Sequence, residues 1–294
     1  MSYRARIEQF CYNLGLDTFG FIPYRRYDEL EAYLKSRPSQ NEFEEKDISK
    51  RVDPSYLMPN VQTILCIAFP YNDGKSVNNG FSIYTQRLDY HKVVRSYLDK
   101  ICEFINSLGA QGVGFVDNNC LNERYLAYLS GIGFIGRNNM LITKKYGSYV
   151  FLAEILIDIK IDCNEVNNYK NIPKFVQCGL CHNCVKVCPT GALNDCNVCL
   201  SYLTQKKDLK LEEIDLLKGN IFGCDFCQKP CPYNININFT NLKEFKSLEF
   251  MQQSADVYMN MDNAFFKNNV KHTSCGWRGK NVIKRNAAIA FERN

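Results

Sequence analysis

The second half of the chain contains the run Cys178-Gly-Leu-Cys181-His-Asn-Cys184-Val-Lys-Val-Cys188-Pro189. It has the spacing C-x2-C-x2-C-x3-C-P of bacterial ferredoxins, in which the first three thiolates bind one [4Fe–4S] cluster and the fourth binds another. Thiolates are the soft ligands that such clusters prefer. The run therefore predicts two [4Fe–4S] clusters.

A second run, Cys224-Asp-Phe-Cys227-Gln-Lys-Pro-Cys231-Pro232, repeats the ending but lacks one ligand. That ligand must come from upstream, where Cys199 and Cys196 are both available. We assign Cys199 to this position, and by the ferredoxin rule the fourth cysteine of each run binds the other cluster. The predicted ligand sets are then, for one cluster, Cys178, Cys181, Cys184 and Cys231, and for the other, Cys188, Cys199, Cys224 and Cys227.

Zinc is the alternative, because it also binds four cysteines, but zinc sites usually show two separated pairs and not a triplet followed by Cys-Pro. The chain has fifteen cysteines, and seven lie outside the predicted ligand sets. Cys11, Cys66 and Cys102 fall on apolar faces and are expected to pack in the core. The pattern assigns no role to Cys120, Cys163, Cys196 or Cys275.

The chain has 294 residues, of which 46% are hydrophobic and 13% aromatic, and a formal net charge of +5. This composition is typical of a folded protein. This charge is too small to indicate a nucleic-acid partner by itself. No run approaches the roughly 18–20 apolar residues of a membrane span, and the first residues lack a secretory pattern. We therefore expect a cytoplasmic protein without a membrane partner, in which the cysteines are not disulfide-bonded.

Strand and helix patterns alternate before the cysteine-rich region. Two long apolar runs predict buried strands at 61–69 and 149–159, and periodic apolar residues predict a helix at 91–108. A strand at 112–117, a helix at 122–130 and a glycine-rich loop at 131–139 complete the pattern. The predicted fold class is α+β: an N-terminal α/β sandwich domain at 1–162, a ferredoxin-like double-cluster domain at 163–240 and a C-terminal helical segment at 241–294.

Several segments outside the cysteine motifs resemble the epoxyqueuosine reductase family, in order and over nearly the whole chain. The N-terminal ones are Lys50-Arg-Val-Asp-Pro54, Leu88-Asp-Tyr-His-Lys-Val93, Val116-Asp117, Glu123-Arg124, Gly131-Ile-Gly-Phe-Ile-Gly-Arg-Asn138 and Leu152-Ala-Glu154. The later ones are Cys199-Leu-Ser-Tyr-Leu-Thr204, Gly223-Cys-Asp-Phe-Cys-Gln228 and Lys284-Arg-Asn-Ala-Ala-Ile-Ala290. Together these motifs are far more specific than a ferredoxin run alone.

The resemblance implies an oxidoreductase that reduces the epoxide of epoxyqueuosine in tRNA, the final step of queuosine biosynthesis. It also implies cobalamin bound base-off in the N-terminal domain. The chain has three histidines and no Asp-x-His-x-x-Gly motif, which fits a cobalt without a lower histidine ligand. The partners expected are tRNA carrying epoxyqueuosine at the wobble position and an external flavodoxin- or ferredoxin-type electron donor. The chain is expected to be a monomer.

Asp117 is the catalytic residue that the resemblance implies, as the acid that protonates the departing epoxide oxygen. It ends a predicted strand, where α/β sites commonly lie. The residues alone favour another role, as N-cap of the helix expected at 122–130. The predicted cobalamin contacts are Arg51, Tyr84, Thr85, Asp117, Arg137, Asn138, Leu141, Ser148, Leu152 and Ser201, with Arg51 and Arg137 equally suited to structural salt bridges.

The last thirty residues are basic, with Glu292 as the one acid among Lys267, Lys271, Arg278, Lys280, Lys284, Arg285 and Arg293. We expect this stretch to contact tRNA phosphates, although a solvated helix explains it equally well. Two other functions fit parts of the sequence. They are a reductive-dehalogenase-like reductase of a small molecule, which would normally carry an export signal, and a two-cluster electron carrier, which would leave the first 160 residues unexplained.

Overall fold

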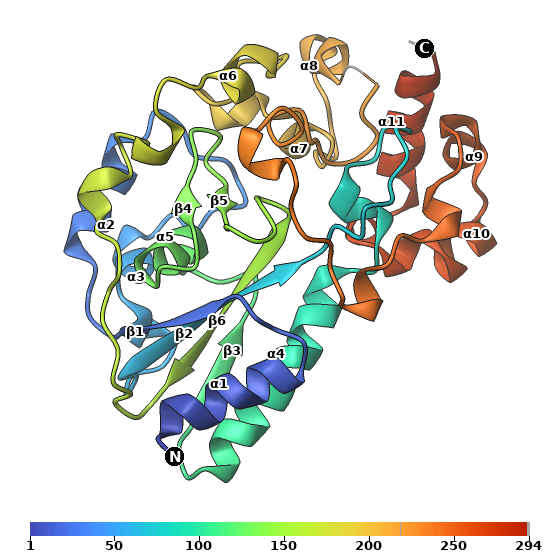
Figure 1. The fold of residues 1–294 in the computed structure, drawn as a ribbon. Coiled ribbons are helices and arrows are strands. Elements are labelled where there is room, and N and C mark those ends of the chain that lie inside the picture. The colour runs from blue at the N-terminus through green and yellow to red at the C-terminus, as the bar shows by residue number, and fades with distance from the viewer. Residues whose placement is uncertain (218, 293–294) are drawn as a thin grey trace. The chain divides into compact units, whose positions relative to one another are not determined.

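The computed structural model describes residues 1–217 and 219–292, which divide into two compact units. The first unit comprises residues 1–37, 42–70 and 91–181, and the second comprises 38–41, 71–90 and 182–294. The units interleave along the chain, so the boundaries predicted after residues 162 and 240 remain proposals. Figure 1 shows the elements of each unit.

A four-stranded sheet forms the centre of the first unit, in the order β1-β2-β6-β3. Every neighbouring pair is antiparallel, a direction that the alternation of strands and helices had left open. Its strands are β1 (Phe19–Pro23), β2 (Thr63–Pro70), β3 (Gly112–Phe115) and β6 (Val150–Ile157), and a separate hairpin joins β4 (Phe134–Ile135) to β5 (Leu141–Ile142).

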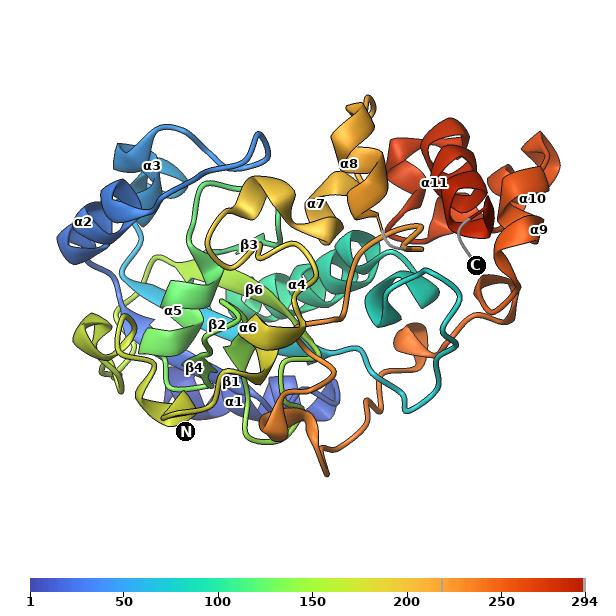
Figure 2. The ribbon, with the colours of Figure 1, turned by 90° about the horizontal axis from the view of Figure 1, so that it is seen from above.

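Helices cover both faces of this sheet (Figures 1 and 2). All eight residues of β2 are buried, as expected for a central strand between two apolar layers. On one face, the Phe10 ring of the N-terminal helix stacks on the Phe104 ring of the helix that precedes β3, with ring centroids 4.2 Å apart. The helices of this unit are α1 (Tyr3–Asn13), α2 (Asp28–Ser36), α3 (Ile48–Val52), α4 (Tyr90–Ser107) and α5 (Glu123–Leu129), and α5 packs on the face opposite α1 and α4.

The second unit consists of short helices and turns, and its described residues form isolated bridges rather than strands. One apolar core joins Phe81 and Phe222 to the C-terminal helices. The helices are α6 (Asn183–Val187), α7 (Leu200–Leu203), α8 (Leu211–Leu216), α9 (Ala255–Asn260), α10 (Asn263–Asn268) and α11 (Lys280–Glu292). The mixed α+β fold class is therefore confirmed.

Within the described residues, no helix combines the length and the apolar character needed to cross a membrane. Cys11 and Cys66 are fully buried, which confirms their predicted place in the core, while Cys102 is partly exposed.

Candidate functional site

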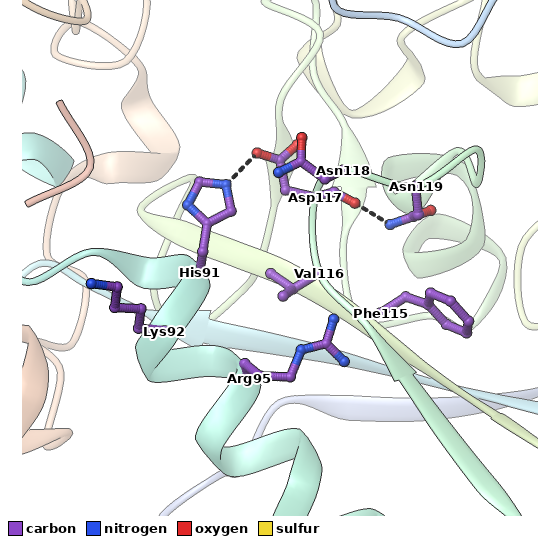
Figure 3. Close-up of a pocket in the computed structure, with 8 residues that line it drawn as sticks. All are labelled: His91, Lys92, Arg95, Phe115, Val116, Asp117, Asn118 and Asn119. Carbon is purple, nitrogen blue, oxygen red and sulfur yellow. Dashed lines mark hydrogen bonds and ion pairs between the residues drawn. The ribbon is translucent and has the colours of Figure 1, made fainter. Parts of the chain in front are cut away.

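Asp117 lies just after β3 and faces the first turn of α4. Its Oδ2 lies 2.8 Å from Nε2 of His91, and Figure 3 shows the two side chains pointing toward each other. This distance is that of a hydrogen bond between the two side chains. An open pocket of about 280 Å³ surrounds the pair, lined by His91, Lys92, Arg95, Phe115, Val116, Asp117, Asn118 and Asn119.

The backbone of Asp117 has a φ of +48°, in the left-handed region that non-glycine residues seldom adopt. Two neighbours hold this conformation. The Asp117 N–H donates to Oε1 of Glu123 at 2.7 Å, and the side-chain amide of Asn119 donates to the Asp117 carbonyl. Such conformations persist where surrounding structure enforces them, and they gather at functional sites.

The structure excludes the alternative role of Asp117 as a helix cap. The N-cap of α5 is Asn122, whose side-chain oxygen accepts a hydrogen bond from the Tyr125 N–H. Asp117 stands five residues before this cap and its carboxylate is directed to His91 instead. The carboxylate is half exposed, so it is open to a molecule in the pocket.

Two further carboxyl groups lie behind the Asp117 loop. The pKa of Glu123 is raised to about 7, first by burial and then by the neighbouring charge of Asp117. Glu154 lies on β6, opposite Cys66 of β2 and Phe115 of β3. Its side chain is fully buried, and neither carboxyl oxygen has a hydrogen-bond partner. Burial and the charge of Glu123 raise the pKa of Glu154 well above its ordinary value.

We expect Glu154→Gln to stabilise the protein at high pH. A carboxyl whose pKa is raised by folding favours the folded state below its unfolded pKa, and this contribution is lost as pH rises through the folded pKa. The free energy of unfolding of the wild type should therefore fall as pH rises above the ordinary pKa range of a glutamate carboxyl. Glutamine does not titrate, so the difference in the free energy of unfolding should grow in the variant's favour as pH rises, by at most about 1.4 kcal/mol per pH unit.

Anaerobic urea unfolding, followed by circular dichroism at several pH values, measures this effect. Glu212→Gln is the matched control, because the side chain of Glu212 is 77% exposed. The free energy of unfolding of this control should change with pH in the same way as that of the wild type. A Glu154→Gln curve that also runs parallel would show that Glu154 is not a buried titrating group.

Arg137, a predicted cobalamin contact, binds the first cysteine motif in this structure. Its guanidinium donates to the carbonyls of Cys181 at 3.1 Å and Gly179 at 2.8 Å, and it lies over the Phe175 ring. The Arg137 backbone N–H donates to Sγ of Cys178 at 3.4 Å. Hydrogen bonds to ligand sulfurs tune cluster potentials, so this arginine supports the motif directly.

Arg51 is buried, and its guanidinium forms an ion pair with Glu44 at 3.0 Å. Glu44 also pairs with Arg37, and the two arginines hold the pKa of Glu44 at about 2 although burial opposes this shift. The ion pair with Glu44 therefore fits the structural salt-bridge role that the sequence left open for Arg51.

The other predicted cobalamin contacts fall in both units. Asn138, Leu141 and Ser148 are buried in the first unit, and Leu152 is half-buried there. Tyr84, Thr85 and Ser201 belong to the second unit. The pKa of Tyr84 is raised by burial and lowered in part by hydrogen bonds with Ser201 and Thr85, so these three hydroxyl groups come together.

Four predicted cluster ligands also come together in the second unit. The pKa of the Cys224 thiol is raised to about 12, mainly by burial and further by the nearby thiols of Cys199 and Cys188. The pKa of Cys227 is raised by burial and then by Cys224, Cys199, Cys184 and Cys188. The thiol of Cys196 contacts Ser39, whose Oγ is 3.3 Å from its Sγ, and it also lies near the thiol of Cys199.

The remaining predicted ligands divide between the units: Cys178 and Cys181 belong to the first, and Cys184 and Cys231 are buried in the second. No three His, Cys, Asp or Glu side chains of the described residues are placed to hold a single metal ion.

Sequence reasoning assigned no role to His91, Glu123 or Glu154. All three stand in segments that resemble the reductase family, so the signal was present. His91 lies in the first turn of α4, and the packing of this helix on the sheet places it opposite the end of β3. An acidic residue inside the otherwise apolar β6 run was the corresponding signal for Glu154.

Two family models match the chain. The model described as Epoxyqueuosine reductase QueG, DUF1730 matches residues 51–118, which contain His91 and Asp117. The model of a 4Fe-4S double cluster binding domain matches residues 177–234, which contain all eight predicted ligands. The chain therefore carries a domain for two iron–sulfur clusters.

Similar proteins cover almost the whole chain. The Epoxyqueuosine reductase of Staphylococcus aureus is 32% identical over 97% of this chain and 78% of its own length. A solved epoxyqueuosine reductase with a tRNA-Tyr epoxyqueuosine-modified tRNA stem loop matches with a TM-score of 0.89, 32% identity, and coverage of 99% and 81%. A Bacillus subtilis epoxyqueuosine reductase structure, described with its catalytic loop swung out of the active site, matches with a TM-score of 0.87, 31% identity, and coverage of 99% and 81%.

Proposed function

This chain belongs to the epoxyqueuosine reductase family and reduces epoxyqueuosine in tRNA to queuosine; we propose that Asp117 supplies the proton and that cobalamin is the bound cofactor. The observation that carries the proposal is the His91–Asp117 pair in an open pocket of the family-matched region.

The reaction removes the epoxide oxygen. Two electrons and two protons convert the three-membered ring to an alkene and water, so both carbon–oxygen bonds break. The oxygen leaves as an alkoxide unless a nearby acid protonates it, and a positioned acid typically contributes 10²–10⁴-fold to such a step. Two iron–sulfur clusters suit the delivery of electrons one at a time.

Asp117 is the proposed acid, and His91 is its proton-sharing partner at 2.8 Å. Glu123 holds the Asp117 loop through the backbone hydrogen bond at 2.7 Å. One similar solved structure is described with its catalytic loop swung out of the active site. We propose that residues 116–119 form the corresponding loop here, with Glu123 as the residue that keeps it in place.

The polar groups of the predicted contacts fit cobalamin, because the corrin periphery carries amide groups that pair with hydroxyl and amide side chains. Asn138 and Ser148 are buried polar residues within the first unit, and the hydroxyl groups of Tyr84, Thr85 and Ser201 come together within the second; each group is proposed separately as a corrin contact. His91 Nε2 is occupied by Asp117, which is compatible with base-off binding. When bound, cobalamin supplies a cobalt that is a strong nucleophile or reductant toward the epoxide.

We propose that tRNA is bound partly by exposed cations in the last turn of α10 and just after this helix. Lys267 and Lys271 are exposed, and Trp277 is 56% exposed with the Arg278 guanidinium 4.0 Å from its ring centroid. Arg285 is used internally, because it donates to the carbonyls of Lys206 and Lys207. Arg293 lies outside the described residues. An external flavodoxin- or ferredoxin-type donor and a monomeric state remain predictions.

The test is turnover by the anaerobically purified chain with its clusters reconstituted. Iron and sulfide should each reach about eight per chain, as two [4Fe–4S] clusters require, and cobalt should reach about one after incubation with cobalamin. With an epoxyqueuosine-modified tRNA stem loop and a low-potential reductant, mass spectrometry should show loss of one oxygen atom from the modified nucleoside.

Two results would contradict parts of this proposal separately. Turnover without added cobalamin, by protein that contains no cobalt, would remove cobalamin and keep the reductase activity. Full cofactor loading with no change in the tRNA nucleoside would show that this chain acts on another substrate.

A further inference from the structure

The segment that carries the first two cluster ligands presents an exposed surface made of Tyr169, Lys170, Lys174, Val176 and Leu180. We name these five residues the entry surface, and we propose that it binds a small acidic electron-transfer protein that reduces the cluster held by Cys178 and Cys181. This inference rests on the proposed function, because a reductase of this kind needs an external electron donor.

The backbone makes the segment compact. Four successive tight turns connect the Ile172 N–H to the Tyr169 carbonyl, the Phe175 N–H to Ile172, the Cys178 N–H to Phe175 and the Cys181 N–H to Cys178, at 2.9–3.2 Å. Ile172 is buried in the core of the first unit. The side chains of residues 169–181 are therefore gathered in a small region that the core anchors.

Two apolar side chains of the entry surface are largely exposed to solvent and contribute little to the core. Leu180 is 98% exposed and Val176 is 57% exposed, and they stand two residues after and two residues before the ligand Cys178. Single exposed apolar residues are common, but several together beside a functional group indicate an interaction site. An electron donor must approach the cluster closely, because electron transfer falls steeply with distance, and these residues surround a ligand.

The positive charge of the segment that contains the entry surface favours an acidic partner. Residues 166–194 contain three lysines and no aspartate or glutamate. The preceding acid, Glu165, is paired with Arg25 at 2.6 Å. Neither Lys170 nor Lys174 forms an ion pair with a described residue. A positive surface steers an acidic protein toward itself and speeds the encounter.

An acidic protein fits this surface better than tRNA does. Phosphate-binding surfaces depend on many cations, each of which adds to the salt dependence. The entry surface has two cations and three large apolar or aromatic side chains. Encounters between electron-transfer proteins use small interfaces and are weak, which such a surface can provide.

The experiment measures cluster reduction in the reconstituted protein, without tRNA or cobalamin. Reduced flavodoxin is mixed with the oxidised protein in a stopped-flow instrument, and the loss of cluster absorbance gives a second-order rate constant. The test variants are Lys170→Glu/Lys174→Glu and Leu180→Ser. The control is Lys144→Glu/Lys160→Glu, which changes the net charge equally at exposed sites of the same unit.

We expect the charge-reversed entry surface to lower the flavodoxin rate constant at least about tenfold at low ionic strength, and high salt should narrow the difference. Leu180→Ser should lower the rate at all salt concentrations. Reduction by dithionite, which needs no docking, should be unchanged in every variant. The control pair should stay within about twofold of the wild type.

Three results would overturn the inference. One is an unchanged flavodoxin rate in both test variants, and another is an equal loss in the control pair, which would indicate steering by net charge alone. The third is weaker binding of the tRNA stem loop with unchanged flavodoxin reduction, which would assign the surface to tRNA. Because cluster reduction is measured directly, failure of epoxide reduction leaves this test readable.

Discussion

Asp117→Asn should lower the single-turnover rate of epoxyqueuosine reduction by about 10²–10⁴-fold, the usual contribution of a positioned general acid. Asparagine retains the size of the side chain and a hydrogen bond with His91, but it cannot deliver a proton. Iron, sulfide and cobalt contents should not change, because Asp117 is neither a predicted cluster ligand nor the only predicted cobalamin contact. Rapid quenching and mass spectrometry of the nucleoside measure the rate.

Asn118→Ala is the matched control for this prediction. Asn118 is exposed on the same loop and lines the same pocket, so its loss should change the rate only a few-fold. If Asp117→Asn also remains within a few-fold of the wild type, Asp117 is not the proton donor. His91 would then be the residue to replace next, because its Nε2 lies 2.8 Å from Oδ2 of Asp117.

Cys199→Ala should remove one cluster and abolish turnover. The structure places Cys199 near Cys188 and Cys224, with Cys227 in the same group, and a [4Fe–4S] cluster needs a fourth thiolate. Iron should fall from about eight to about four per chain. The residual cluster should be visible by electron paramagnetic resonance after reduction.

Cys196→Ala distinguishes this ligand assignment from its alternative. Cys196 is three residues from Cys199 and has the same chemistry, but its thiol contacts Ser39. Iron should stay at about eight per chain in this variant. If Cys196→Ala loses the cluster and Cys199→Ala keeps it, the ligand assignment is reversed. Circular dichroism of both variants separates cluster loss from general unfolding.

Local patterns in the sequence predicted the elements of the fold well. The apolar period placed a helix at 91–108, and α4 runs over Tyr90–Ser107. The buried run at 61–69 corresponds to β2 at Thr63–Pro70. These features depend on neighbouring residues, whose spacing the covalent chain sets. The pattern left open the direction of the strands, because a strand that is covered on both faces reads as a continuous apolar run in an antiparallel sheet as well as in a parallel one.

The catalytic reading of Asp117 shows a limit of the sequence. The argument that sites lie at the carboxyl ends of strands applies to parallel sheets, and this sheet is antiparallel. The residues alone favoured a helix cap, but the cap is Asn122. Asp117 is distinguished by its left-handed backbone conformation and by its contact with His91. Neither feature can be read from the residues next to position 117.

The sequence by itself determined the cluster chemistry, because ligand type and spacing within a few residues are covalent properties of the chain. It also indicated the family, through motifs spread along the chain. Tertiary structure alone decided which distant groups meet: His91 with Asp117 across 26 residues, and Arg137 with the Cys178–Cys181 loop across about forty. Such contacts depend on how the sheet and helices pack, and no local period encodes that packing.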